Sequence, residues 1–374
     1  MVEVLSKGRA KSTRIMSLLR RLVWLSLRHN FHIFPSHIAG AENVVADALS
    51  RFNYTIFFQA MPDADPENNL TAFSEFLLLG FQVSKSLRIF LFCLLLVVYI
   101  GAIYGNLLII TLVSTSKILH TPMYFFISQL SIGDILLATD VVPNMLHILL
   151  NNGGAMTIIG CLTQFNFFCA AEVFECLLLT VMSYDRYVAI CKPLHYTSVM
   201  TSVCCVKLAI ITMLLGLSMA FTEVITISML TFCGPNIIDH FFCDLLPLLD
   251  VSCSDTFIVQ TEIFLLSIPS VFIPTAIIIY SYVNIVLAII RIPSSTGRQK
   301  AFFTCSSHLT VVSIFYWSLF SVYVVPSKGK TLTISKILSL IYTVFTPMMN
   351  PIIYSLRNKD IKRAAYDIIH KSRR

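Results

Sequence analysis

Asp185 and Arg186 are the residues whose types and position point most directly to chemistry. They lie in Met182-Ser-Tyr-Asp-Arg-Tyr-Val-Ala-Ile-Cys191, at the end of an apolar run long enough to cross a bilayer. Charged groups at the mouth of a membrane helix are costly unless they reach water or polar partners. A guanidinium there can pair with the neighbouring carboxylate or bind backbone carbonyls. The pair is therefore predicted to act as a switch, the alternative being an ordinary arginine that reaches the membrane surface.

Three acidic residues lie deeper in the same apolar surroundings. Counted from Arg186 at about 1.5 Å per residue, Glu175 lies roughly 16 Å and Glu172 roughly 21 Å into the membrane. Asp134 is similarly enclosed within an earlier apolar run. An ionisable group near the bilayer midplane is a functional hypothesis by default, and the alternative is a protonated, hydrogen-bonded acid. We expect a functional polar network.

Seven apolar runs must position these groups. Hydrophobic residues make up 56% and charged residues 13% of the 374 residues, and the mean hydropathy is +0.79. Runs of about 20 apolar residues indicate bilayer crossings, and backbone groups in hydrocarbon must be satisfied internally, which favours helices. The runs lie near 89–113, 123–150, 162–183, 206–230, 257–290, 302–325 and 334–355. The predicted fold is an all-α membrane protein with a seven-transmembrane helix bundle.

The placement of Lys and Arg predicts the orientation. No Lys or Arg lies between Lys117 and Arg186, or between Lys207 and Arg291. Basic residues gather instead in the odd-numbered connections and the C-terminal tail, although three lysines within 328–336 oppose the trend. We therefore expect a multi-pass plasma-membrane protein with an extracellular N-terminus and a cytoplasmic C-terminus.

Residues 1–67 differ from the rest of the chain. Of the formal net charge of +7, the first 52 residues carry eight basic and three acidic residues, a net +5. His29–Arg51 resembles the end of a retroelement ribonuclease H domain, in which the residue matching Asp47 binds metal. One carboxylate cannot hold two metal ions, so no nuclease activity is expected. We interpret 1–67 as a disordered extension or fused remnant and 68–374 as the membrane domain, with no nucleic-acid partner.

Four cysteines are placed for disulfides on the outer side. Cys161 lies 25 residues before Arg186, about 37 Å along a helix, and the connection after the fourth run holds Cys233, Cys243 and Cys253. This oxidising side favours disulfides, but four cysteines allow three connectivities and spacing does not choose among them. Asn69, in Asn69-Leu-Thr71, is a glycosylation acceptor just outside the first run.

Five sets of short strings, in order, resemble the olfactory receptors, a branch of the rhodopsin-like G-protein-coupled receptors. They are Gly105-Asn106; Pro122–Phe126 with Leu130–Asp134; Met182–Cys191 with Lys192–Tyr196; Lys300–Leu309; and Pro347–Asn358. The likeness covers about residues 68–370. A non-olfactory rhodopsin-like receptor is the alternative, and a transporter would show internal repeats that this chain lacks. One departure is Trp317, where the family usually has Gly; its bulk is expected to reshape the pocket.

The resemblance implies an odorant receptor that activates a stimulatory, olfactory-type heterotrimeric G protein, with no enzymatic activity and no cofactor. It selects the disulfides Cys161–Cys243 and Cys233–Cys253. It implies activation-switch residues at Asp185, Arg186, Tyr187, Tyr282, Asn350, Pro351 and Tyr354. It also implies a polar core of Asn106, Asp134 and Glu175, in which Asp134 and Glu175 sometimes hold sodium. The residues after Tyr354 predict a short C-terminal membrane-surface helix.

The odorant is expected among the third, fifth and sixth spans. Phe168, Cys169, Glu172 and Val173 share one face of the third span at helical spacing. The resemblance places that face against Leu266, Ser267, Ser270, Tyr316, Phe320 and Tyr323. Such a mostly apolar lining suits small volatile or weakly polar molecules. An ionised Glu172 would favour an amine or hydroxyl-bearing ligand, and a protonated one an ester or ketone.

Overall fold

The computed structural model describes residues 74–232, 236–324 and 332–371. They belong to a unit that spans residues 72–374. The predicted extension, residues 1–67, and the acceptor Asn69 lie outside the described residues, so both stay predictions.

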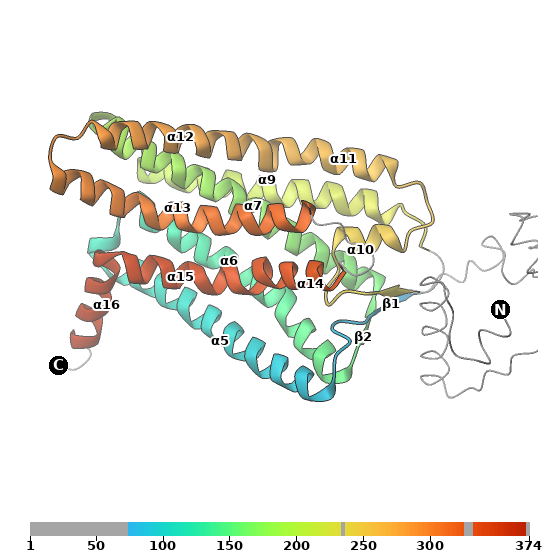
Figure 1. Ribbon diagram of the computed structural model, residues 1–374. Helices are drawn as coiled ribbons and strands as arrows, with labels where there is room; N and C mark the ends of the chain where they lie inside the picture. Colours follow the sequence, from blue (N-terminus) through green and yellow to red (C-terminus); the bar gives the residue numbers. More distant parts are fainter. Residues whose placement is uncertain (1–73, 233–235, 325–331, 372–374) are drawn as a thin grey trace, which may run out of the picture. The chain divides into compact units, whose positions relative to one another are not determined.

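Seven long helices form the bundle (Figure 1). Six are long and apolar enough to cross a membrane: α5 (Lys85–Thr115), α6 (Pro122–Asn151), α7 (Ile158–Cys191), α9 (Ser202–Ser228), the helix Phe257–Ile290 and the helix Ile334–Ser355. The seventh is α13 (Ser295–Val324), which is 30 residues long and packs against its neighbours α12 and α15. The predicted seven-helix bundle is confirmed.

Two of these helices contain a π-helical turn. The helix Phe257–Ile290 consists of α11 (Phe257–Ser267), η4 (Ile268–Phe272) and α12 (Ile273–Ile290). The apolar stretch Ile334–Ser355 lies within α14 (Leu332–Leu340), η6 (Ile341–Phe345) and α15 (Thr346–Arg357). Such turns insert one extra residue and often occur at functional sites. They rotate the following half of each helix relative to the first.

The helix boundaries follow ordinary capping rules. Thr157 and Thr201 accept hydrogen bonds from the first free backbone N–H groups of α7 and α9. Pro122 opens α6, where its missing N–H costs nothing. Asn152 ends the same helix in the left-handed conformation. Local sequence thus determines where the spans begin and end.

Gly105 explains one of the recognised strings. A Cβ atom at Gly105 would lie 2.9 Å from Cγ of Pro351, so only glycine lets α5 approach the proline ring of α15 this closely. Pro351 lies inside α15, which continues through it. The ring of Pro351 therefore packs directly against the α5 backbone at Gly105.

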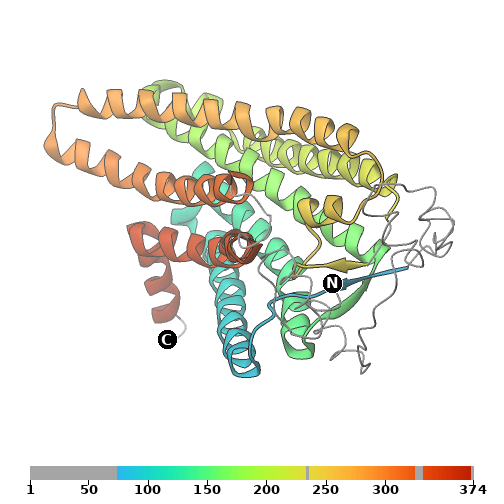
Figure 2. The same cartoon turned by 45° about the vertical axis from the view of Figure 1, so that its right-hand side comes forward.

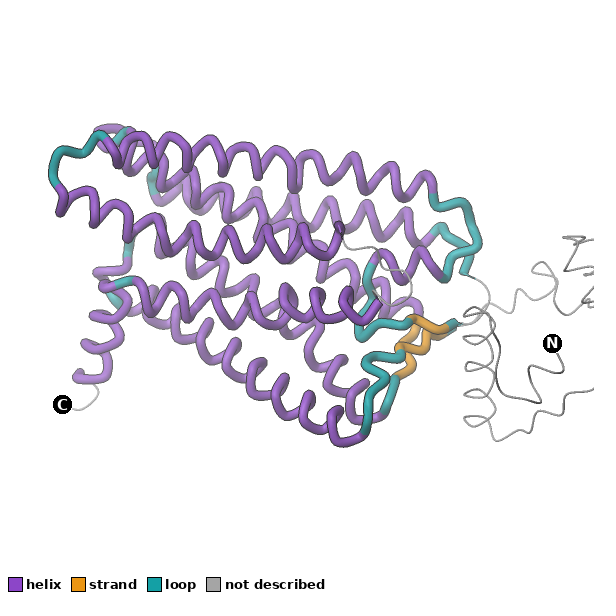
Figure 3. The backbone as a smooth tube through the Cα atoms, viewed as in Figure 1, coloured by secondary structure: helices purple, strands orange, loops and turns teal. Residues whose placement is uncertain are grey.

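A small sheet covers one end of the helices, an element that the all-α prediction missed (Figure 2, Figure 3). It consists of β1 (Glu75–Leu78), β2 (Gly154–Thr157) and β3 (Ile237–Ile238). β1 pairs antiparallel with β2 and parallel with β3. The helix α10 (Leu245–Asp250) follows the last strand. We call this the sheet end of the bundle.

Short helices mark the opposite end, which we call the α16 end. They are η2 (Lys117–Leu119), η3 (Pro193–His195), α8 (Tyr196–Val199) and α16 (Lys359–Lys371). The predicted C-terminal helix is therefore present, with Ile361 and Ala364 buried against the bundle. Its position on a membrane surface stays a prediction.

The outer faces of the bundle are apolar. Val97 and Tyr104 of α5 and Leu214 of α9 are more than half exposed. Polar side chains gather inside instead, including Asn106, Asp134 and Ser183. Apolar side chains outside and polar side chains inside are the reverse of a water-soluble protein. This arrangement fits a helix bundle surrounded by lipid.

Candidate functional site

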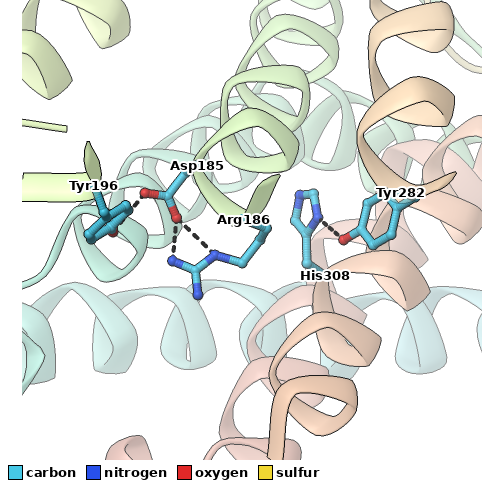
Figure 4. Close-up of polar contacts among 5 residues, drawn as sticks. All are labelled: Asp185, Arg186, Tyr196, Tyr282 and His308. Atoms are coloured by element: carbon cyan, nitrogen blue, oxygen red, sulfur yellow. Dashed lines mark hydrogen bonds and ion pairs between the residues drawn. The ribbon is translucent and has the colours of Figure 1, made fainter. Parts of the chain in front are cut away.

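Asp185 and Arg186 form an ion pair at the α16 end (Figure 4). The carboxylate of Asp185 accepts a hydrogen bond from Nε of Arg186 at 2.8 Å and also contacts Nη2. Its other oxygen accepts from the Tyr196 hydroxyl at 2.9 Å. Burial and the nearby Asp185 raise the pKa of Tyr196, so its hydroxyl keeps its proton. Tyr196 therefore helps to hold the Asp185–Arg186 ion pair in place. The sequence analysis did not predict this role.

A second polar contact joins α12 to α13. The hydroxyl of Tyr282 lies 2.6 Å from Nδ1 of His308, as Figure 4 shows. Both side chains are buried. Sequence reasoning named Tyr282 but missed His308, although this histidine lies within the recognised string Lys300–Leu309. The sequence feature that could have identified His308 is a histidine within an apolar, membrane-spanning run.

The polar core lies deeper in the bundle. Nδ2 of Asn350 donates to both carboxyl oxygens of Asp134, at 2.9 and 3.1 Å. Nδ2 of Asn106 donates to the backbone carbonyls of Ala102 at 3.0 Å and Pro347 at 2.9 Å. The structure thus connects α5, α6 and α15 through amide side chains.

Three buried polar atoms in or near this core have no partner in the described part of the chain. They are Oδ1 of Asn106, Oε1 of Glu175 and the hydroxyl of Tyr354. All three side chains are at most 1% exposed. Buried polar atoms without partners are rare and call for an explanation. Each is a candidate for a contact made in another state or with a ligand.

Tyr187 lies apart from this machinery. Its ring contacts those of Tyr184 and Tyr280, and Nζ of Lys192 lies 5.7 Å from the ring centroid. These contacts place it on the α12 side of α7. Its role in the switch therefore stays a prediction without direct support.

The predicted pocket residues of α7 have different environments. Phe168 is buried against Phe242 and Tyr342, with ring centroids 5.0 and 5.7 Å away. Cys169, Glu172 and Val173 are partly buried. Phe168 thus packs under the segment ahead of α10, whereas the other three retain some accessible surface.

Cys176 joins the three helices expected around the odorant. Its thiol donates to the backbone carbonyl of Ser270 at 2.8 Å and lies 3.0 Å from the Tyr316 hydroxyl. The Ser270 hydroxyl donates to the carbonyl of Leu266, one turn earlier. Ser267 bonds within its own helix to Phe264. Sequence reasoning missed Cys176, which occurs one turn after Glu172.

Two residues of α13 face away from the bundle. Trp317 is 73% exposed and Phe320 62% exposed. The expectation that Trp317 reshapes the pocket was wrong, because its ring lies on the outer face. Phe320 is three residues later on the same face, so we do not carry it into the proposed pocket. The side chain of Tyr323 lies outside the described residues.

A cavity of about 530 Å³ lies between α12 and α13. Its lining is almost wholly apolar, apart from Thr275, Ser313 and the two tyrosines Tyr282 and Tyr316. Tyr316 therefore contacts Cys176 on one side and this cavity on the other. The cavity reaches the Tyr282–His308 contact.

Covalent and ionic contacts hold the sheet end together. Cys161 and Cys243 form a disulfide, as the resemblance implied. Cys253 is disulfide-bonded too, whereas Cys233 lies outside the described residues. Nζ of Lys336 donates to the Gly80 carbonyl at 2.8 Å and to Asp239 at 2.5 Å. These contacts connect β1, the β3 segment and α14.

Two titratable groups at the sheet end have shifted pKa values. Burial, and next Lys336, lower the pKa of His240 to about 3, so this histidine is neutral. Burial raises the pKa of Asp244 to about 6, against the backbone N–H of Leu245, which donates to it at 2.8 Å. Among the described residues, no group of three or more His, Cys, Asp or Glu is arranged to hold a metal ion.

Comparisons with known proteins identify one sequence family and, separately, one fold. The family model described as "Olfactory receptor" matches residues 92–372. Human olfactory receptor 5G3 is 46% identical over 298 residues, covering 80% of this chain and 95% of the relative. Human olfactory receptor 6N1 is 44% identical over 296 residues, covering 79% and 95%. The crystal structure of squid rhodopsin has the same fold, with a TM-score of 0.63 and 18% identity over 78% of this chain and 88% of that one.

Proposed function

The chain belongs to the olfactory receptor family, and we propose that its odorant binds among α7, η4 and α13. It is a multi-pass membrane receptor for odorants that couples to a G protein, and it is not an enzyme. The finer proposal is that the G protein is of the stimulatory, olfactory type and binds at the α16 end. The family match removes the alternative of a non-olfactory receptor.

The contact of Cys176 with Ser270 and Tyr316 carries the proposed binding site. It brings α7, η4 and α13 together at one level of the bundle. Glu172 and Val173 lie one turn or less from Cys176 towards the sheet end and keep accessible surface. A small molecule bound beside Glu172 and Val173 would therefore change the spacing of α7, η4 and α13, which the Cys176 thiol joins.

Several side chains lie in succession between this site and the switch. Tyr316 borders the cavity between α12 and α13, and that cavity reaches Tyr282. Tyr282 contacts His308, whose neighbourhood includes the charge of Arg186. We infer that the Tyr282–His308 contact is the two-state element whose equilibrium both sites influence.

The proposed mechanism is a population shift. The contacts of Arg186 with Asp185 and of Tyr282 with His308 favour a closed α16 end. Odorant would favour the state in which α13 moves outward and both contacts break. The freed Arg186 and the hydroxyl of Tyr354, which now lacks a partner among the described residues, would then help to bind the G protein.

We also propose the direction of insertion. The sheet end would face the outside, because disulfides form on the oxidising side of a membrane. The C-terminus, next to the basic α16, would then be cytoplasmic. A C-terminal epitope tag that antibodies reach only after permeabilisation is the expected result, and staining of intact cells would contradict it.

A sodium site at Asp134 and Glu175 fits one observation. Oε1 of Glu175 is a buried carboxyl oxygen without a partner in the described residues, and its charge acts on Asp134. A monovalent cation would supply the missing contact. Asp134 and Glu175 would hold it, next to the amide of Asn350.

A cAMP reporter assay tests the proposed function. The full chain is expressed with an olfactory-type stimulatory G protein and exposed to a broad odorant panel. We expect at least one odorant to raise cAMP, and Arg186→Ala to abolish the response while surface staining persists. A response that survives Arg186→Ala, or one that appears only with a different G-protein class, would contradict the proposal.

A further inference from the structure

We propose that the cavity between α12 and α13 is a second binding site, which takes one fatty acyl chain of a membrane phospholipid. The odorant site proposed above lies among α7, η4 and α13, so the two sites are distinct, although Tyr316 borders both. We infer the chain from the shape of the cavity, the chemistry of its lining and its position along the helices.

The cavity opens on the outer face of the bundle. Its volume of about 530 Å³ is typical of a small-molecule site. Its floor includes Ile278 and Val312, which are each 5% exposed. Five other lining residues are 42 to 59% exposed: Ile279, Val283, Val286, Leu287 and Leu309. Because lipid surrounds the bundle, the cavity opens to hydrocarbon rather than to water.

The polar groups of the lining already have partners. The hydroxyls of Thr275 and Ser313 donate to backbone carbonyls one turn earlier in their own helices, both at 2.7 Å. The two tyrosine hydroxyls contact His308 and Cys176. A water molecule needs two to four polar partners to stay in a cavity, so this lining excludes water. A polar ligand would leave its own donors unsatisfied there. The lining therefore favours hydrocarbon.

The length of the cavity matches one leaflet of a bilayer. α12 lines it from Thr275 to Leu287, which is about 18 Å along the helix. α12 ends at Ile290, three residues after Leu287, at the α16 end of the bundle (Figure 1). The cavity thus runs from near the membrane surface towards the bilayer centre. Half of the hydrocarbon core is about 15 Å thick. One acyl chain whose headgroup stays at the surface spans this distance.

The distribution of polar groups favours a chain over a sterol. Val286, Leu287 and Leu309 line the surface end of the cavity, whereas Thr275 and Tyr316 lie at its deep end. A sterol hydroxyl lies near the membrane surface, where these three apolar side chains offer it no partner. A phospholipid keeps its polar headgroup outside the cavity and places only hydrocarbon inside it.

Packing, rather than the hydrophobic effect, would hold the chain. Lipid tails are as apolar as this lining, so moving a chain from the bilayer into the cavity gains little hydrophobic free energy. A concave wall surrounds the chain on more sides than a flat helix surface, and dispersion attraction grows with the number of atoms in contact. Binding therefore depends on shape, and a bulky side chain in the cavity should displace the chain.

A bound chain would favour the closed state. It lies between two helices whose spacing changes in the proposed mechanism, and Tyr282, which contacts His308, lines the cavity. A ligand shifts a population towards the state that it binds better. Because the cavity occurs in the closed state, the chain should oppose the outward movement of α13. This effect rests on the proposed function, whereas binding of the chain does not.

Photolabelling of the full-length receptor in phosphatidylcholine nanodiscs tests the binding. A small fraction of the phosphatidylcholine carries a diazirine in the middle of one acyl chain, and mass spectrometry locates the labelled residues. We expect Ile279 and Leu309 to be labelled several-fold more than Leu108 in α5. Leu108 is the matched control for Val283, because both are 53% exposed and both lie seven residues before the α16 end of their helix.

Variants that fill the cavity locate the effect. Val283→Trp should remove most of the label at Ile279 and Leu309, and Val286→Phe should give a smaller loss. Leu108→Trp should leave the label in the cavity unchanged. Thermal unfolding midpoints confirm that the variants are folded. A cavity label that persists in both Val283→Trp and Val286→Phe would contradict the proposal.

Two further outcomes identify other occupants. Equal labelling of the cavity and of Leu108 would mean ordinary surrounding lipid only and would overturn the proposal. Added cholesterol that removes the cavity label but not the label at Leu108 would replace the acyl chain by a sterol.

A cAMP assay separates this inference from the proposed function. Val283→Trp acts as a permanently bound chain, so it should lower basal cAMP while surface staining persists. Leu108→Trp should change neither. If the label is confined to the cavity and Val283→Trp leaves cAMP unchanged, the chain site stands and the proposed outward movement of α13 fails.

Discussion

The two halves of the bundle interior differ in how their acids are satisfied. At the α16 end, Asp185 is paired with Arg186 and accepts from Tyr196. Farther towards the sheet end, Glu175 and Glu262 each have a buried carboxyl oxygen that receives no hydrogen bond from the described residues. The first half is held by contacts within the chain, so we expect mutations there to change the balance between states. In the second half, we propose that a bound molecule supplies the contact that the chain itself does not make.

Removing the disulfide should have the largest effect of these changes. It should destabilise the sheet end and leave the contacts at the α16 end intact. Cys161→Ser opens a covalent loop with a sequence separation of 82 residues. Loops of this length correspond to roughly 4 kcal/mol in the unfolded chain. We expect surface staining in intact cells to be lost. Cys93→Ser is the control, because Cys93 is an exposed free cysteine and its removal should change little.

Adding a side chain at Gly105 should disrupt the contact between α5 and Pro351 of α15. Gly105→Ala places a methyl group 2.9 Å from the Pro351 ring, and such overpacking costs about 1–3 kcal/mol. The unfolding midpoint should fall. Gly101→Ala, with nothing within 4 Å, should hold or raise it, because alanine favours helices by about 1 kcal/mol. Equal midpoints for the two variants would contradict the contact.

Acid should stabilise the sheet half through Asp244. Its pKa of about 6 is above the value of 3.8 expected for a free aspartate. A raised acid pKa gives stability that is complete below pH 3.8 and lost as pH rises through 6. Asp244 should therefore make the receptor more stable at pH 5 than at pH 8 by about 1.4 kcal/mol. Asp244→Asn should remove this difference, measured by thermal unfolding.

Weakening the α12–α13 contact should have the smallest effect of these changes, and at the α16 end only. Tyr282→Phe removes the hydroxyl that lies 2.6 Å from His308. A buried hydrogen bond contributes about 1 kcal/mol, so basal cAMP should rise roughly fivefold. Tyr280→Phe is the control, since Tyr280 is 62% exposed. Unchanged basal cAMP in Tyr282→Phe would argue that this contact does not hold the closed state.

Much of the fold could be predicted from residue type and spacing. The lengths of the apolar runs predicted the seven helices, because a bilayer crossing requires about 20 apolar residues. The Asp185–Arg186 pair was predicted from two charges at the end of such a run. The Cys161–Cys243 bond was implied by resemblance alone, since spacing left three connectivities open.

The sequence by itself determined that this chain spans a membrane, which stretches form its long helices and which charged groups are enclosed, because these follow from local composition. Only the tertiary structure decided which way each helix turns about its axis. That rotation points Trp317 and Phe320 outward and brings His308 to Tyr282. It depends on packing between helices distant in sequence, as at Gly105 and Pro351, where no single segment carries the information.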